Sequence, residues 1–263
     1  MDLGLAGRAC AVTGASRGIG LEVARKLCAE EARVLLVARD AKALASARDD
    51  CRTAGGDAEI LALDITDRDA GERIRAAAEG AFGRLDVLVN NAGGSQRRPL
   101  ADVPEEDWYA AWELNVMAPL RAMRAAIPAM AERGWGRVVN VSSTSGKRPS
   151  TTSAEYSVAK AAELSLSRVF ADAYAREGVL VNAVCPGPTK SGMWMEEGGI
   201  LDQTRGAASR EEGLAKAGAG RPIGRLADVD EIADAIVFLC SERASYVAGA
   251  AWSVDGGTVA VII

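Results

Sequence analysis

The sequence predicts an α/β fold in a single domain, in which helices cover both faces of a mainly parallel sheet. Short apolar runs rich in Val, Leu and Ala alternate with longer amphipathic stretches along the whole chain, a pattern typical of βαβ units. The 263 residues, of which 49% are hydrophobic, are enough to bury one large core. The 28 glycines and 8 prolines are spread out, so the sequence indicates no linker or second domain.

Seven apolar runs fit strands, and six amphipathic stretches fit the helices around them. The expected strands are residues 8–13, 33–38, 58–63, 85–90, 136–142, 179–185 and 251–254. The expected helices are residues 18–30, 41–54, 68–82, 105–133, 154–177 and 228–241. Because strands and helices alternate, the carboxyl ends of the strands should meet at one edge of the sheet, where ligands bind.

One segment, between Pro186 and Arg225, breaks the alternation, since it turns to Gly, Met, Glu and Ala without a strand pattern. It follows a late strand, so it should lie beyond the carboxyl edge of the sheet. We expect a substrate lid over about residues 188–225. A plain surface insertion is the alternative.

The composition excludes several kinds of chemistry. The chain has no histidine, which excludes a Ser-His-Asp triad, a Cys-His pair and any zinc site that contains histidine. The five cysteines are scattered without a CxxC pair, so we expect no disulfide framework, no metal site and a reducing, cytoplasmic setting. The net charge of −5 argues against nucleic-acid binding, and we expect neither an export signal nor a membrane anchor.

A glycine-rich turn, Thr13-Gly14-Ala15-Ser16-Arg17-Gly18-Ile19-Gly20, joins the first expected strand to the first helix. Glycines let the backbone pass close to a pyrophosphate, and a helix N-terminus offers free N–H groups, although tight strand-to-helix turns also use glycine. The turn lacks the Gly-Lys-Ser/Thr ending of a nucleoside triphosphate loop. The cofactor contacts expected here are Gly14, Ser16, Arg17, Gly18, Ile19 and Gly20.

The end of the second strand indicates which dinucleotide would bind. A carboxylate at Ala38 would hold both ribose hydroxyls of NAD, but alanine stands there and Arg39 follows it. With Arg17, two guanidinium groups are available for a 2′-phosphate, which favours NADP(H) over NAD(H). The alternative is that both arginines are ordinary surface charges and that Asp40 reaches the ribose.

Tyr156 and Lys160 stand four residues apart in an expected helix and therefore on one face of it. An ammonium close to a phenol favours the phenolate, which makes tyrosine usable as an acid or base without histidine. The spacing alone is common by chance. It occurs here with Asn90-Asn91-Ala92-Gly93 after the fourth strand, Ser142-Ser143 after the fifth and the glycine turn, and chance is a poor explanation of the whole set.

In these motifs the sequence resembles the short-chain dehydrogenase/reductase family over essentially the whole chain, and is similar to its 3-oxoacyl reductases. TGASRGIG, NNAG, Ser143, YSVAK, Pro186-Gly187 and SVDGG stand in the family's order and spacing. The resemblance implies a Rossmann-type, doubly wound sheet of seven mainly parallel strands. It also implies a catalytic tetrad of Asn115, Ser143, Tyr156 and Lys160.

By this resemblance Tyr156 exchanges a proton with the substrate oxygen, to which Ser143 also hydrogen-bonds. Lys160 would bind the nicotinamide ribose, and Asn115 would hold a water that leads protons outward. Further cofactor contacts are implied at Asp64, Ile65, Asn91, Ala92, Gly93, Tyr156, Lys160, Pro186, Gly187, Thr189 and Ser191. Ser145, Met193 and Trp194 are the expected substrate contacts, although packing also explains an apolar pair in this place.

Pro119 bears on the tetrad directly. In a regular helix the Asn115 carbonyl accepts the N–H of residue 119, but proline has no N–H. We therefore expect a free carbonyl at Asn115 and a bend in the helix. A proline merely tolerated at a bend is the alternative.

These observations predict an NADP(H)-dependent oxidoreductase that interconverts a ketone and a secondary alcohol, either a 3-oxoacyl thioester or a cyclic or aliphatic ketone. Gly134 and Glu177 replace the basic residues typical of reductases that act on acyl carrier protein, which weakens that choice. An NAD-dependent alcohol, sugar or steroid dehydrogenase and a non-catalytic dinucleotide-binding regulator are the alternatives. The apolar residues 258–263 predict contact with a partner surface. Because members of the family are commonly tetramers, the resemblance implies a homotetramer, with a dimer as the alternative.

Overall fold

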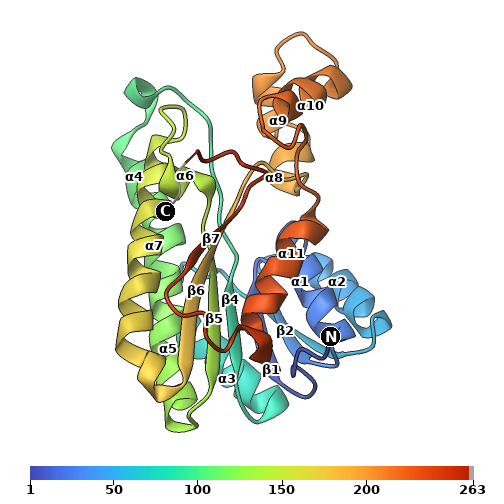
Figure 1. The fold of residues 1–263 in the computed structure, drawn as a ribbon, viewed down its shortest axis with the longest axis vertical. Helices are drawn as coiled ribbons and strands as arrows, with labels where there is room; N and C mark the ends of the chain where they lie inside the picture. The colour runs from blue at the N-terminus through green and yellow to red at the C-terminus, as the bar shows by residue number, and fades with distance from the viewer. Residues whose placement is uncertain (261–263) are drawn as a thin grey trace.

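A parallel sheet forms the centre of the protein, whose computed structural model describes residues 1–260 (Figure 1). Within that range seven strands pair in the order β3-β2-β1-β4-β5-β6-β7, and every neighbouring pair is parallel. The strands are β1 (Ala9–Thr13), β2 (Arg33–Ala38), β3 (Asp57–Ala62), β4 (Val87–Asn90), β5 (Gly136–Val141), β6 (Val179–Pro186) and β7 (Ala251–Val254). The doubly wound sheet predicted from the sequence is confirmed, and its strands are all parallel within the described residues.

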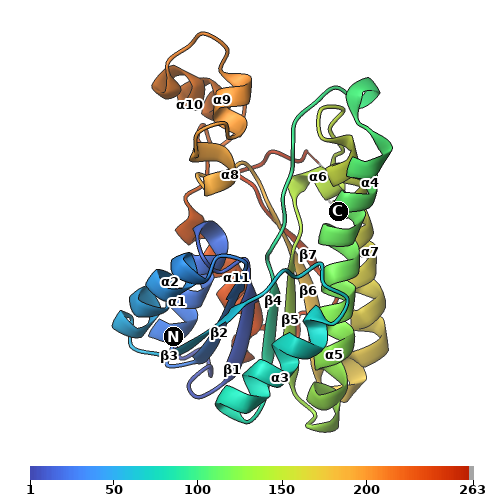
Figure 2. The same ribbon diagram turned by 180° about the vertical axis from the view of Figure 1, so that it is seen from behind.

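Helices cover both faces of the sheet, as Figures 1 and 2 show from opposite sides. One face carries α1 (Gly18–Ala29), α2 (Ala41–Thr53) and α11 (Val229–Cys240). The other carries α3 (Ala70–Phe82), α5 (Ala118–Glu132) and α7 (Ala154–Tyr174). Shorter elements are η1 (Leu100–Asp102), α4 (Glu105–Trp112), α6 (Thr144–Lys147), η3 (Ala175–Glu177) and η4 (Glu242–Ala244). No helix of residues 1–260 is long and apolar enough to cross a membrane.

The strands are apolar on both sides because helices cover both. In β1, Cys10 and Val12 pack into the core beneath α1 and α11, whereas Ala9 and Ala11 pack into the core on the α3 and α5 side. All five cysteines are buried and free. Two separate cores, one per face, therefore hold the sheet between its two layers of helices.

The helix expected over 105–133 is interrupted. A π-helical turn, η2 (Glu113–Met117), lies between α4 and α5, and the N–H of Ala118 donates to the Glu113 carbonyl five residues back. Pro119 stands at the start of α5, where a missing N–H costs the helix least. The departure from α geometry that the proline predicts is present, and it falls at Asn115. That the Asn115 carbonyl is free stays a prediction.

The segment after β6 projects beyond the carboxyl edge of the sheet and carries three short helices, α8 (Gly192–Met195), α9 (Ile200–Thr204) and α10 (Arg210–Ala219) (Figure 1). Its two ends meet at a neck, where Ala227 donates to the Pro188 carbonyl and accepts from the Lys190 N–H at 3.0 and 2.8 Å. The sequence indicated irregular structure here because helices of four to ten residues leave little periodicity to detect. Its role as a lid stays a prediction.

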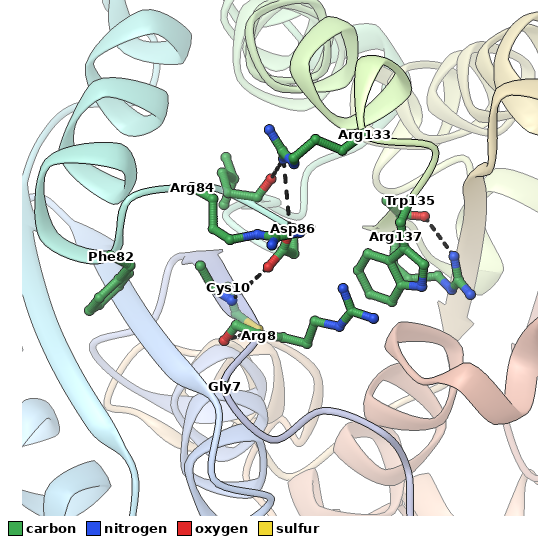
Figure 3. A network of polar contacts seen from close by, with 12 residues as sticks. Gly7, Arg8, Cys10, Phe82, Arg84, Asp86, Arg133, Trp135 and Arg137 are labelled. Atoms are coloured by element: carbon green, nitrogen blue, oxygen red, sulfur yellow. Dashed lines mark hydrogen bonds and ion pairs between the residues drawn. The ribbon is translucent and has the colours of Figure 1, made fainter.

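A polar cluster closes the opposite, amino-terminal edge of the sheet (Figure 3). Asp86, only 1% exposed, accepts the N–H of Ala9 at 3.1 Å and a hydrogen bond from Arg84 Nε at 2.6 Å. Beside it the Arg8 guanidinium lies 3.7 Å from the centre of the Trp135 ring. These contacts tie β1 to β4 and β5 far from the candidate site.

Candidate active site

The residues singled out in the sequence gather at the carboxyl edge of the sheet. Asn91, Ala92 and Gly93 follow β4, and Ser143 follows β5. The two strands are parallel neighbours, and Asn90 of β4 is paired with Asn140 of β5. Tyr156 and Lys160 lie in the first turns of α7, which packs on that side. The topology therefore brings the expected tetrad and the glycine turn to one edge, as the alternation of strands and helices predicts.

The glycine turn fits a dinucleotide pyrophosphate. Gly14 has φ +67°, and a Cβ there would lie 2.9 Å from both Ala92 Cα and Asn91 Nδ2, so a larger residue is excluded. The following helix, α1, has no side-chain cap at Arg17 and no acidic residue in its first turn. Its free N–H groups and positive dipole end thus face the turn without an internal acceptor.

Thr13 organises the turn, a role that was not predicted for it. Its buried hydroxyl accepts the N–H groups of Asn91 and Ala92, both at 3.0 Å, and donates to the Val89 carbonyl at 3.4 Å. The Asn91 side chain in turn donates to the Thr13 carbonyl at 2.9 Å. The ends of β1 and β4 are thereby locked together under the expected cofactor path.

Lys160 is almost completely buried, and its Nζ has two acceptors. It donates to the Val141 carbonyl at 2.8 Å and to Oε2 of Glu163 at 2.9 Å, and it lies 5.8 Å from the centre of the Tyr156 ring. Burial lowers the pKa of the Lys160 ammonium, but the nearby acidic groups, Glu163 foremost and Tyr156 next, together outweigh burial and raise it. Burial raises the pKa of Glu163, and Lys160 opposes that rise. Glu163 was not anticipated from the sequence.

Asn115 presents an unpaired oxygen next to this lysine. The side chain is fully buried, its Nδ2 donates to the Ala111 carbonyl at 2.9 Å, and its Oδ1 has no hydrogen-bond partner among residues 1–260. A Cβ on Gly93 would lie 3.0 Å from this Oδ1 and 3.5 Å from Lys160 Nζ. Glycine at 93 therefore leaves open the space to which the amide oxygen and the ammonium are both adjacent.

Ser143 is held at the start of α6. Its Oγ accepts the N–H of Ser145 at 3.1 Å, and both residues are half-buried. Tyr156 is 9% exposed, so most of its side chain is packed. The arrangement supplies a phenol and a hydroxyl at the carboxyl edge, with the ammonium behind them.

At the expected adenosine end, the Asp40 carboxylate makes a hydrogen-bonding contact of its own. Its Oδ1 caps α2 by accepting the N–H groups of Lys42 and Ala43 at 2.9 and 3.0 Å. Arg39 is 81% exposed and lies 3.9 Å from Asp64, whose pKa is lowered by hydrogen bonds from Thr66. The capping contact argues against the alternative in which Asp40 holds the ribose.

The segment after β6 carries the remaining expected contacts. A Cβ on Gly187 would lie 2.8 Å from Asp255 Cα, so glycine allows the ends of β6 and β7 to meet, and the buried Thr189 donates to the Gly187 carbonyl at 2.9 Å. Ser191 precedes α8, which holds Met193 and Trp194. Met193 is 37% exposed, more than core packing explains.

The fold and this site define a class of protein: the chain belongs to the short-chain dehydrogenase/reductase family and is an oxidoreductase acting on hydroxyl and keto groups. Residues 14–259 match the family described as enoyl-(acyl carrier protein) reductase. The chain is 38% identical to cis-4-hydroxycyclohexanecarboxylate dehydrogenase of Sinomonas cyclohexanicum, over 99% of its length and 100% of the relative's.

Two further relatives cover the full fold. The chain is 33% identical to 3-oxoacyl-[acyl-carrier-protein] reductase of Vibrio cholerae, over 97% of its own length and 98% of the relative's. Among solved structures, L-sorbose reductase from Gluconobacter frateurii, complexed with NADPH and L-sorbose, superposes with a TM-score of 0.94 and 32% identity. That match covers 100% of both chains.

Proposed function

We propose that this protein is an NADP(H)-dependent reductase of a small free ketone, cyclic or sugar-like, which it converts to a secondary alcohol. The observation that carries the proposal is the joint placement of Tyr156, Ser143 and Lys160 at the carboxyl edge, beside a glycine turn whose helix N-terminus has no internal acceptor. The bound NADPH supplies the hydride. The protein supplies position, hydrogen bonds and the proton.

The choice of NADP(H) rests on the adenosine end of the site. No carboxylate ends β2, Asp40 is used in capping α2, and Arg17 and Arg39 follow the neighbouring strands β1 and β2. A 2′-phosphate would meet two guanidinium groups there. The NADPH in the L-sorbose reductase structure supports the same choice.

In the proposed reaction Tyr156 gives its proton to the substrate oxygen as the hydride arrives, and Ser143 donates a hydrogen bond to the same oxygen. Lys160 binds the nicotinamide ribose and keeps a positive charge near the phenol, which stabilises the phenolate left after transfer. Asn115 borders the space through which Tyr156 regains a proton. Without histidine, the chain has no other side chain in this set that exchanges protons readily near neutral pH.

A free ketone is favoured over a carrier-bound thioester. The relative of highest identity given above carries the name of a hydroxycyclohexanecarboxylate dehydrogenase, and the structural neighbour holds a sugar. Met193 and Trp194, on α8 next to the cofactor segment, offer an apolar wall suited to a compact ring. We further propose that the segment 188–225 acts as a lid over that substrate and that the protein assembles as a homotetramer; residues 261–263 of the apolar end lie outside the described range.

The test is an absorbance assay of NADPH and NADH oxidation with cyclohexanones, ketoses and a 3-oxoacyl thioester. We expect NADPH-linked turnover, with kcat/KM higher for at least one free ketone than for the thioester. Faster turnover with NADH, or with the thioester, would overturn the corresponding part of the proposal.

A further inference from the structure

The carboxylate of Glu163 contacts the ammonium of Lys160. Lys160 Nζ and Glu163 Oε2 are 2.9 Å apart, three residues from each other on α7, and their side chains are only 3% and 1% exposed. Taking two charges out of water is costly, and a pair of apolar residues of this size would cost less. A charged pair that is buried this deeply and includes an expected catalytic residue, Lys160, therefore indicates a functional role.

The surroundings fix both partners. One hydrogen of the ammonium goes to the Val141 carbonyl and a second goes to Glu163, so the third is left for the space beside Gly93. Beside the ion pair, the backbone carbonyl of Glu163 accepts from Ser167 Oγ at 2.8 Å, and the Ser142 side chain, like Lys160, opposes the rise that burial causes in the pKa of the Glu163 carboxyl. The Val141 carbonyl and the Glu163 carboxylate thus hold the Lys160 ammonium in place.

Few other titratable groups act on the pair. From β6, Cys185 faces it, and burial raises the pKa of that thiol to about 11, so it is neutral near pH 7. From α6, Lys147 acts on Cys185, but its Nζ is bound to the Ala251 carbonyl and Ser253 Oγ at 2.6 and 2.9 Å. On α7 itself, Tyr156 is the other group that acts on the pKa of Lys160. Glu163 is thus the negative charge that acts on Lys160 most directly.

The carboxylate has a predictable effect on Tyr156. A lone ammonium in a dry site strongly favours the phenolate, but a carboxylate in contact with that ammonium cancels much of its field. Proton loss from the tyrosine then requires a higher pH. A protonated tyrosine is the form that ketone reduction needs, since it must donate to the product oxygen.

We propose that Glu163 is a positioning residue that anchors Lys160 and moderates its charge, so that Tyr156 keeps its proton to higher pH and the enzyme favours reduction. This inference rests on the proposed function, because it assigns Tyr156 the role of acid. Glu163 itself touches neither substrate nor cofactor in this account and acts only through Lys160.

The experiment titrates Tyr156 directly. Phenolate absorbance is followed against pH in the enzyme without cofactor, and the same curve for Tyr156→Phe is subtracted to remove the other three tyrosines. Glu163→Gln removes the charge and keeps the size. We expect its Tyr156 midpoint to fall by about one pH unit, and the alkaline limb of kcat/KM for ketone reduction to fall with it.

Three further variants make the result specific. Glu163→Asp keeps the charge and should restore a midpoint close to that of the wild type. Glu163→Leu replaces the glutamine variant if that one does not fold, and should give the same shift. Asp172→Asn removes an exposed charge of α7 that is paired with Arg168, and should leave the midpoint unchanged.

A folded Glu163→Gln protein with an unmoved midpoint would overturn the inference, even if its stability had changed, because a purely structural role predicts only the loss of stability. Failure of the proposed function is distinguishable: the wild type would then show no NADPH-linked turnover of any ketone, while the phenolate titration would still report on Glu163.

Discussion

Arg17 of the glycine turn and Glu196, directly after α8, form an ion pair with Nη1 and Oε1 2.5 Å apart. The pair joins the expected phosphate end of the site to the projecting segment, and both side chains are about half exposed or more. The same guanidinium that is proposed to meet the 2′-phosphate is thus already paired with a carboxylate. Under the proposed function, NADPH would have to compete with Glu196 for it.

This competition gives a first prediction. Glu196→Gln should tighten NADPH binding by up to about fivefold at low salt, since an exposed pair of this kind is worth only about 0.2–1 kcal/mol. NADH, which has no 2′-phosphate, should bind as before. Fluorescence titration of both cofactors checks it, and weaker NADPH binding in the variant would contradict the competition.

Arg39 supports a second prediction. A guanidinium–phosphate hydrogen bond contributes about 1.5–3 kcal/mol, so Arg39→Ala should lower kcat/KM for NADPH by roughly tenfold to a hundredfold. The value for NADH should hardly change. Adding Ala38→Asp to Arg39→Ala introduces a repulsive carboxylate and should reverse the preference. Steady-state rates with both cofactors measure the effect; equal losses for NADPH and NADH would refute the assignment of Arg39.

The third prediction concerns stability at the far edge of the sheet. Asp86→Asn should lower the free energy of unfolding by about 1–3 kcal/mol, because Asp86 is buried and serves both the Ala9 N–H and Arg84. Urea unfolding measures this loss. The exposed Asp172→Asn is the control and should cost less than about 1 kcal/mol. The kcat of folded Asp86→Asn should match that of the wild type, since the site lies at the opposite edge.

The strands were predictable because strands buried on both faces are nearly uninterrupted runs of Val, Leu and Ala. The expected ranges 33–38 and 251–254 coincide with β2 and β7, and the others differ by one or two residues at one or both ends. The interruption at η2 was indicated by a single covalent fact, the missing N–H of Pro119. The three short helices after β6 left no comparable signal.

The contacts between residues of the site were less predictable from the sequence than the identity of those residues. Glu163 lies one helical turn from Lys160, but the motif that drew attention ends at the lysine. The available signal was the position of this glutamate, which lies between Ala162 and Leu164 on a helix that must bury one face. The pairing of Arg17 with Glu196 spans 179 residues, and no local pattern encodes it.

The central claim is that Tyr156 donates the proton in an NADPH-dependent ketone reduction, and Tyr156→Phe tests it most directly. Losing the hydroxyl leaves the packing of the ring in place, so the dissociation constant for NADPH should stay within about threefold of the wild type. With a ketone that the wild type reduces, kcat should fall by about a hundredfold or more, since no other group can replace the acid. A variant that binds NADPH normally and retains more than about a tenth of the wild-type kcat would contradict the account.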